Sequence, residues 1–116
     1  MAEVRRGDLW WVDWSPSRGS EQSGRRPALV VQTDTGNCNS RYTNTIVVTV
    51  SSQGRAAVPT HVRLAATEES GLKQDSYAKC EQVLTISKDR LERKIGRVSA
   101  TELRAAYQAL IEVVGP

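Results

Sequence analysis

The sequence predicts a mainly β protein, in which a small antiparallel barrel or strongly curved sheet carries one C-terminal helix. Several short runs of apolar and β-branched residues alternate with segments rich in Gly, Asn, Asp and Ser. The last segment has the three- and four-residue spacing of an amphipathic helix. The length of 116 residues fits one domain over residues 1–116.

The first strand is predicted over residues 8–14, where "DLWWVDW" contains the three tryptophans of the chain. Alternation gives this strand two faces, which carry Trp10, Val12 and Trp14 on one side and Leu9, Trp11 and Asp13 on the other. Trp10, Trp11 and Trp14 have the composition of a base-stacking platform. Because they lie in an alternating strand, however, we expect them to pack in the core or in a dimer interface.

Two further strands follow at residues 28–32, "ALVVQ", and 45–51, "TIVVTVS". Between them, "TDTGNCNSRYTN" is dense in turn-forming residues and is predicted to be a loop. A short strand is expected at residues 61–64, after Pro59, which disfavours a helix before it.

The segment at residues 77–86, "YAKCEQVLTI", predicts one interrupted strand or two. Ser87 is placed to cap a single helical turn over residues 88–91. A last strand is expected at residues 94–98.

The C-terminal helix begins with Ser99 followed by Glu102, which is the spacing of a capping box. Its apolar stripe consists of Leu103, Ala106, Tyr107, Leu110 and Val114. We expect this stripe to pack on the sheet, and Gly115-Pro116 to end the helix.

Composition limits the classes of function. Lys and Arg total 16 against 13 Asp and Glu, a mild preference for polyanionic partners. Cys38, Cys80 and the single histidine, His61, lack metal-site spacing, so no metal is expected and the cysteines are expected to be reduced. With no glycine-rich phosphate loop or dinucleotide fingerprint, no cofactor is expected either. The N-terminus "MAEVRRGD" lacks a signal-peptide core and no apolar run approaches ~20 residues, which predicts a cytoplasmic protein without membrane contact.

The usual catalytic sets do not fit this chain. One histidine excludes a histidine-pair ribonuclease, and no nucleophile elbow supports a serine triad. The carboxylates of the N-terminal third are too scattered for a two-metal nuclease. Any chemistry must therefore depend on arginine, glutamate and hydroxyl groups, which are dense in "GSEQSGRRP" at residues 19–27.

The stretch "RRGDLWWVDWSPSRGSEQSGRRPALVVQ" resembles the opening of the MazF/PemK family, the toxin halves of bacterial toxin–antitoxin pairs. The resemblance continues in order through "IVVTVSSQ" (46–53), "PTHV" (59–62) and "EQVLTI" (81–86). It implies an SH3-like barrel of the CcdB/PemK type, a homodimer and neutralisation by a cognate antitoxin. It also implies a metal-independent, sequence-specific endoribonuclease for single-stranded RNA. In this family the 2′-hydroxyl of the RNA attacks, leaving a 2′,3′-cyclic phosphate and a 5′-hydroxyl.

The resemblance also assigns catalytic positions. The family's arginine before proline falls on Arg26, and its hydroxyl partner, usually threonine, falls on Ser51 with Ser52 beside it. Serine keeps the hydroxyl but loses the methyl group that restricts the rotamer. Glu21 is either the base for the 2′-hydroxyl or a carboxylate that orients the arginines.

The remaining matched positions are expected to bind RNA rather than to cleave it. They are Arg6, Ser20, Gln22, Gln53, His61, Glu81 and Gln82. Arg25 is expected to be a general phosphate contact, and Ser52 remains an alternative to Ser51. For His61, RNA contact and a structural role stay equally open.

Two alternatives to the endoribonuclease remain. A CcdB-like gyrase poison would share the fold, but such proteins use a C-terminal Trp-Gly-Ile, whereas this chain ends Val-Val-Gly-Pro. An inert RNA-binding barrel would bind RNA without producing a cyclic phosphate.

Overall fold

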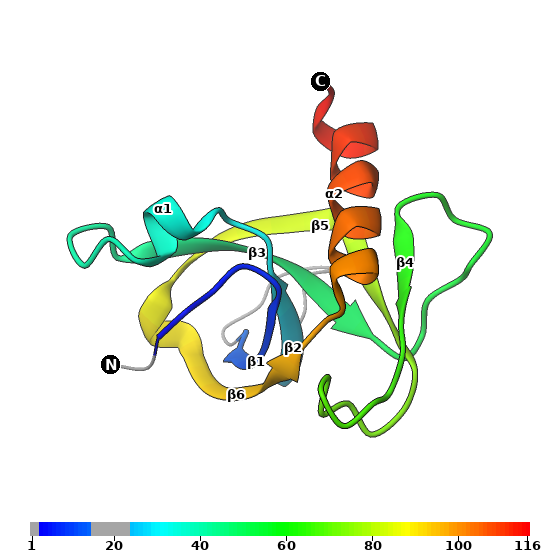
Figure 1. The fold of residues 1–116 in the computed structure, drawn as a ribbon, viewed down its shortest axis with the longest axis horizontal. Helices are drawn as coiled ribbons and strands as arrows, with labels where there is room; N and C mark the ends of the chain where they lie inside the picture. Colours follow the sequence, from blue (N-terminus) through cyan, green and yellow to red (C-terminus); the bar gives the residue numbers. More distant parts are fainter. Residues whose placement is uncertain (1–2, 15–23) are drawn as a thin grey trace.

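The computed structural model describes residues 3–14 and 24–116. In chain order the elements are β1 (Asp8–Asp13), β2 (Arg25–Val30), α1 (Asp34–Asn37), β3 (Asn44–Ser51), β4 (His61–Leu64), β5 (Ser76–Ser87), η1 (Lys88–Arg90), β6 (Leu91–Arg97) and α2 (Ala100–Val114). Figure 1 shows one curved sheet with α2 standing beside β4 and β5. The mainly β fold with a C-terminal helix is therefore confirmed.

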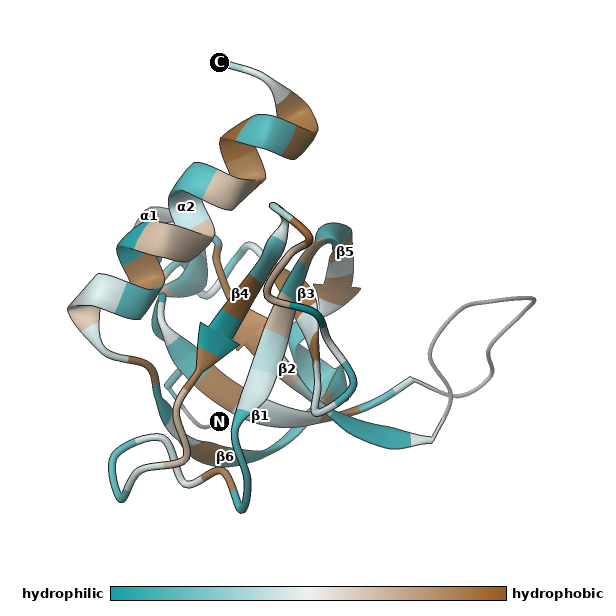
Figure 2. Ribbon diagram, turned by 90° about the vertical axis from the view of Figure 1, so that its right-hand side faces the viewer, coloured by the Kyte–Doolittle hydropathy of each residue, from teal (hydrophilic) through white to brown (hydrophobic). Residues whose placement is uncertain are grey.

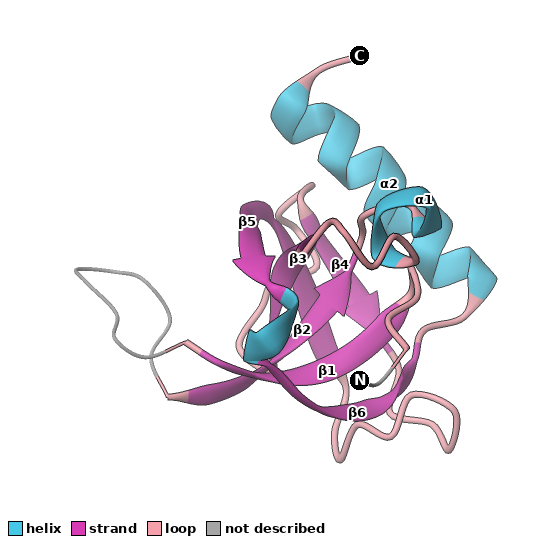
Figure 3. Ribbon diagram, turned by 90° about the vertical axis from the view of Figure 1, so that its left-hand side faces the viewer, coloured by secondary structure: helices cyan, strands magenta, loops and turns pink. Residues whose placement is uncertain are grey.

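The strands form one antiparallel sheet in the order β4-β5-β3-β2-β1-β6. The sheet curls strongly, as Figure 3 shows. The β4–β5 loop contacts the edge strand β6, where the amide of Arg97 donates to the carbonyl of Glu69 at 2.9 Å. A Cβ added at Gly96 or Gly71 would overlap the backbone facing it, so this close approach requires glycine at both positions.

Alternation along β1 divides the core into two clusters. Trp10, Val12 and Trp14 are buried together on one face, as predicted. Leu9 belongs to the other cluster, against which α2 packs. Trp11 is half-buried on the same side as Leu9. The structure therefore treats the three tryptophans differently, and two of them are core residues.

A bulge interrupts β5. Val48 of β3 pairs with Val83, but the next residue, Thr49, pairs with Lys79. Residues 80–82 of β5 therefore have no partner in the register with β3. Before this bulge β5 pairs with both β3 and β4, and after it β5 pairs with β3. The predicted interrupted strand is a single bulged strand.

The capping box at the start of α2 is present as predicted. The Ser99 hydroxyl accepts from the Glu102 amide at 3.1 Å, and Glu102 Oε1 accepts from the Ser99 amide at 2.9 Å. Glu102 Oε2 also accepts from the Ala65 amide at 2.8 Å, which ties the helix to the end of β4.

The predicted apolar stripe of α2 is partly wrong. Ala106 is buried and Leu103 and Leu110 pack against the core, but Tyr107 and Val114 are 51% and 70% exposed. Figure 2 shows the reason for Val114, since the last turn of α2 projects beyond the strands. Tyr107 faces outward, with the Arg6 guanidinium 5.7 Å from its ring centre.

Helix α1 replaces part of the predicted loop at residues 33–44, so that prediction was wrong there. The buried Lys88 of η1 holds this region: its Nζ donates to the carbonyls of Gly36, Asn37, Asn39 and Tyr42 at 2.6–3.2 Å. A pattern of turn-forming residues cannot predict hydrogen bonds from a residue so far along the chain. The predicted Ser87 cap is present, because its Oγ accepts from the Asp89 amide at 3.3 Å.

The last strand, β6, is longer than predicted and begins at Leu91 instead of residue 94. Pairing with β1 extends it, from Leu91 opposite Val12 to Arg97 opposite Asp8. Of the helices described here, none is both long and apolar enough to span a membrane.

Candidate active site

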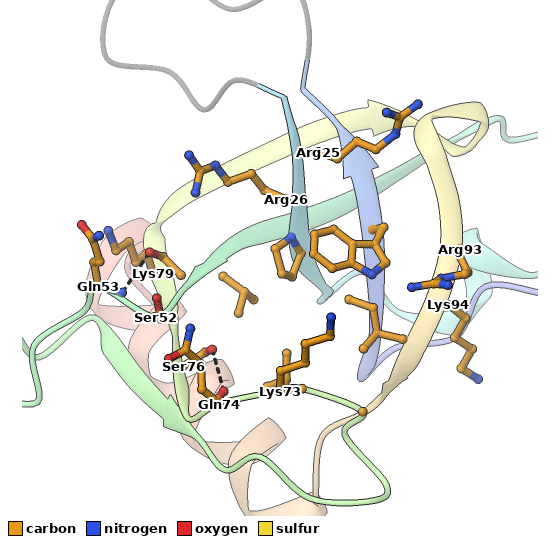
Figure 4. A pocket seen from close by; sticks show the side chains of 17 residues that line it. Arg25, Arg26, Ser52, Gln53, Lys73, Gln74, Ser76, Lys79, Arg93 and Lys94 are labelled. Carbon is orange, nitrogen blue, oxygen red and sulfur yellow. Dashed lines mark hydrogen bonds between the residues drawn. The ribbon is translucent and has the colours of Figure 1, made fainter.

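A pocket of about 710 Å³ lies where the ends of β2 and β3 face β6 and the β4–β5 loop (Figure 4). Its lining consists of Trp11, Arg25, Arg26, Pro27, Val50, Ser51, Ser52, Gln53, Gly71, Leu72, Lys73, Gln74, Ser76, Lys79, Arg93, Lys94 and Ile95. Six of these residues are Arg or Lys, and none of the described lining residues is Asp or Glu. We call this site the cationic pocket.

The two arginines begin β2, immediately before its buried part. Arg25 and Arg26 are exposed, whereas Ala28–Val30 are fully buried, so the arginines project from a strand fixed in the core. Arg25 forms an ion pair with Glu92 of β6, with 2.6 Å between Nε and Oε1. This hydrogen bond raises the pKa of Arg25. In Figure 4 the Arg26 guanidinium points to the side of the pocket that holds Gln53 and Lys79, and Arg25 points the other way.

The predicted hydroxyl group lies at the end of β3. Ser51 is half-buried, and its Oγ accepts a hydrogen bond from the Gln53 amide at 3.0 Å. Because that amide occupies an acceptor position, the hydroxyl hydrogen of Ser51 is free to point toward another acceptor. Ser52 is exposed, so Ser51 is the better positioned of the two serines.

The rest of the pocket lining was missed by sequence reasoning. It carries Lys73 and Gln74 from the β4–β5 loop, Ser76 and Lys79 from β5, and Arg93 and Lys94 from β6. These residues come from three polar segments that showed no shared motif. The sheet order brings them to the same pocket as Arg26, because it places β5 next to β3 and β6 next to β1.

Lys94 connects this part of the lining to the buried Asp8. Its Nζ lies 3.2 Å from Asp8 Oδ1, and Asp8 Oδ2 accepts from the Arg5 amide at 2.9 Å and from Trp10 Nε1 at 3.3 Å. Asp8 is fully buried. A buried carboxylate needs such partners, so the Asp8 of the "RGD" motif is explained by packing of the N-terminal turn.

Several predicted site residues lie elsewhere. Ser20, Glu21 and Gln22 are outside the described residues. Arg6 lies between α1 and α2, where its amide donates to Asp34 Oδ1 at 2.7 Å and its guanidinium faces Tyr107. The structure therefore does not bring Arg6 to the cationic pocket.

His61, Glu81 and Gln82 surround the β5 bulge. His61 Nε2 lies 2.9 Å from Glu81 Oε2, and Thr60 Oγ1 donates to Glu81 Oε1 at 2.8 Å. Burial acts to raise the pKa of Glu81, but the hydrogen bonds from His61, the backbone and Thr60 outweigh it and lower that pKa. Gln82 Oε1 accepts from the buried Thr49 hydroxyl.

His61 lines a second pocket of about 730 Å³ between α2, β4 and β5. Its lining also includes Arg63, Tyr77, Glu102, Ala109 and Glu112. We call it the α2 pocket. His61, Glu81 and Gln82 are therefore outside the lining of the cationic pocket, and each already has a hydrogen-bond partner within the protein.

The described residues include no group of three or more His, Cys, Asp or Glu side chains placed to hold a metal ion. Burial, with a smaller effect of Glu81, raises the pKa of the Cys80 thiol to about 11. Cys80 is consequently a protonated core thiol at neutral pH and a poor nucleophile.

The chain resembles known proteins in both sequence and fold. The family model described as PemK-like, MazF-like toxin of type II toxin-antitoxin system matches residues 5–114. Endoribonuclease MazF9 of Mycobacterium tuberculosis is 43% identical over 110 residues, which cover 92% of each chain.

Among solved structures, a crystal structure of MazF from Deinococcus radiodurans has a TM-score of 0.82, at 23% identity over the whole of both chains. An endoribonuclease in complex with its cognate antitoxin, from a mycobacterial species, has a TM-score of 0.77 at 21% identity, over 97% of this chain and 95% of that one. At these identities the structures support the fold.

Proposed function

Since the chain belongs to the PemK-like, MazF-like toxin family of type II toxin–antitoxin systems, we propose that it is an endoribonuclease that cleaves single-stranded RNA in the cationic pocket. The observation that carries this proposal is the meeting of Arg26 and Ser51 in one pocket lining. These are the two positions that match the family's catalytic pair, and they lie 25 residues apart in the sequence.

Charge supports RNA as the substrate. A pocket lined by six cations, with no carboxylate among its described lining residues, suits the phosphates of a nucleic acid. Trp11 is half-buried in the same lining, whereas Trp10 and Trp14 are core residues. Trp11 is thus the tryptophan that could stack on a base of a single strand.

The proposed reaction is transesterification followed by product release. The 2′-oxygen forms a bond to phosphorus while the bond from phosphorus to the 5′-oxygen breaks, which leaves a 2′,3′-cyclic phosphate and a 5′-hydroxyl. The 2′-proton passes to a base, and the leaving 5′-oxygen takes up a proton. No metal ion is needed for these steps.

The residues divide this work between them. The phosphorane concentrates negative charge on its non-bridging oxygens, and the Arg26 guanidinium offers paired donors to them. A guanidinium stays protonated at neutral pH, so Arg26 stabilises charge or donates a proton rather than accepting one. Ser51 adds its hydroxyl hydrogen as a further donor, and Glu21 is the base or the carboxylate that orients the arginines.

The rival functions are less well supported. The relatives named above are endoribonucleases and MazF toxins, so the CcdB-like gyrase poison is not favoured. A solved relative is in complex with its cognate antitoxin, and we propose a cognate antitoxin and a homodimeric state for this chain as well.

The test is digestion of a long RNA in EDTA by the purified protein and by Arg26→Ala. We expect the wild type to cleave and to leave cyclic phosphate and 5′-hydroxyl ends, as read by primer extension and end-group labelling. Arg26→Ala should lose at least ~10²–10³ in rate, the usual effect of removing one such donor. Full activity in Arg26→Ala with an unchanged circular dichroism spectrum would remove Arg26 from the mechanism, and RNA bound without cleavage by the wild type would favour the inert binding barrel.

A further inference from the structure

The segment from β3 to β4 is held by three consecutive residues. Gln53 donates its amide to Ser51 Oγ, and Arg55 donates its amide to His61 Nδ1 at 3.1 Å. Between them Gly54 lies flat against Tyr77, because an added Cβ would overlap the Cβ and ring of that tyrosine. The backbone that follows Ser51 is therefore fixed to β3, β5 and β4 in turn.

The contact with Arg55 indicates the tautomer of the neutral His61 ring. A backbone amide can only donate, so Nδ1 must carry a lone pair. The ring proton then lies on Nε2, which donates to Glu81 Oε2 at 2.9 Å. Both nitrogens of the neutral ring are satisfied, and the side chain is 12% exposed.

We propose that His61 is a positioning residue for the cleavage reaction, acting through the Arg55 amide on the segment that holds Ser51 and Gln53 at the cationic pocket. The proposal rests on the proposed function of that pocket. It gives His61 no contact with RNA, which replaces the substrate-binding role that the family resemblance implied. Ser51 and Gln53 line the pocket, whereas His61 lines the α2 pocket on the other side of this segment.

Two substitutions separate the nitrogens of the ring. Asparagine places its side-chain oxygen near the position of Nδ1 and can accept from the Arg55 amide, whereas glutamine reaches the position of Nε2 and Glu81. His61→Asn should therefore keep kcat within ~3-fold of the wild type. His61→Gln should lose ~10-fold or more in kcat with little change in KM, because the six cations of the cationic pocket stay in place.

The structural readout is hydrogen exchange at the Arg55 amide, followed by NMR. We expect faster exchange in His61→Gln than in the wild type at the same pH, and near-native exchange in His61→Asn. Gly54→Ala, which displaces the same segment from Tyr77, should reproduce the kcat loss of His61→Gln.

The outcomes are distinct from those that test the proposed function. Equal kcat loss in His61→Asn and His61→Gln, or a rise in KM in both, would assign His61 to RNA contact and overturn the proposal. Unchanged Arg55 exchange in His61→Gln would overturn it as well, even if the wild type proved inactive on RNA. A preserved kcat in His61→Asn, with a lost kcat and fast Arg55 exchange in His61→Gln, would support it.

Discussion

The cationic pocket and the α2 pocket have nearly the same volume, about 710 and 730 Å³, but opposite chemical character. The first has six cations, and its described lining residues include no carboxylate. The second is lined by Glu102 and Glu112 against Arg63 and His61, with alanine and valine side chains between them. The volumes of the two pockets do not indicate which one suits RNA. Their charges do, because an RNA strand carries a negative charge at every phosphate.

The two pockets also differ in the hydrogen bonds of their polar side chains. In the α2 pocket Glu102 caps α2 and holds the Ala65 amide, while His61 holds Glu81 and Arg55. These side chains are occupied in keeping the fold together. In the cationic pocket Lys73 extends from the β4–β5 loop into the space between the walls, as Figure 4 shows. The comparison therefore favours substrate binding in the cationic pocket, as proposed, and a mainly supporting role for the side chains of the α2 pocket.

The largest effect expected within this comparison comes from the two neighbouring serines. Ser51→Ala should lower kcat by ~10²-fold, because it removes a donor that the Gln53 amide holds in place. Ser52→Ala, the matched control on the exposed neighbour, should stay within ~3-fold of the wild type. A larger loss in Ser52→Ala than in Ser51→Ala, measured in single-turnover cleavage, would transfer the catalytic hydroxyl to Ser52.

A smaller effect on RNA cleavage is expected from the cations of the cationic pocket that belong to no family motif. Lys73→Gln and Arg93→Gln should each raise KM by ~3- to 10-fold with kcat nearly constant, and should lower the slope of log K against log salt by ~0.7 per cation removed. Arg104→Gln on α2, an exposed cation outside both pockets, is the matched control. If all three variants change KM and the salt slope equally, RNA binding follows net charge and not this pocket.

In the α2 pocket the effect should fall on stability instead. Glu102→Ala removes the acceptor for the Ser99 and Ala65 amides and should cost ~1–2 kcal/mol of unfolding free energy in urea. At temperatures where the variant remains folded, kcat and KM should be unchanged. A folded Glu102→Ala protein with impaired cleavage would show that the α2 pocket takes part in function.

The smallest effect concerns the cysteines, which lie outside both pockets. Burial raises the pKa of Cys80 to about 11, so at pH 8 it keeps its proton and should not react with a thiol reagent until the protein unfolds. Cys38 is exposed and should react in the native state. Modification of Cys38 alone should leave RNA cleavage intact; reaction of two thiols per native chain would contradict the buried position of Cys80.

Much of the fold follows from local patterns. The alternation of β1, the apolar run of β2 and the capping box of Ser99 and Glu102 are short-range signals, and each describes the structure correctly. The predictions from sequence were wrong where contacts between residues far apart in the chain determine the local structure. Lys88 organises the loop around α1 from 46 or more positions away, and the outward position of Tyr107 depends on where α2 crosses the sheet.

The candidate site divides in the same way. The arginine before Pro27 and the hydroxyl after β3 can be identified from motifs, and the structure brings Arg26 and Ser51 together. Lys73, Lys79 and Arg93 could not be predicted, because their proximity depends on a sheet order that places β5 beside β3 and β6 beside β1. The "EQ" motif predicts substrate contact for Glu81 and Gln82, and the β-bulge adds what the motif could not show, hydrogen bonds of Glu81 with Thr60 and of Gln82 with Thr49.

The most direct test of the central claim is to map bound RNA on the two pockets. An oligonucleotide containing the cut sequence, with a 2′-deoxyribose at the scissile nucleotide, cannot be cleaved by attack of its own 2′-hydroxyl and can be titrated into labelled protein in EDTA. We predict NMR shift changes at Ser51, Gln53, Lys73, Lys79 and Arg93, and none in residues 101–112 of α2. Shift changes confined to α2 and β4, with the cationic pocket unaffected, would contradict the account.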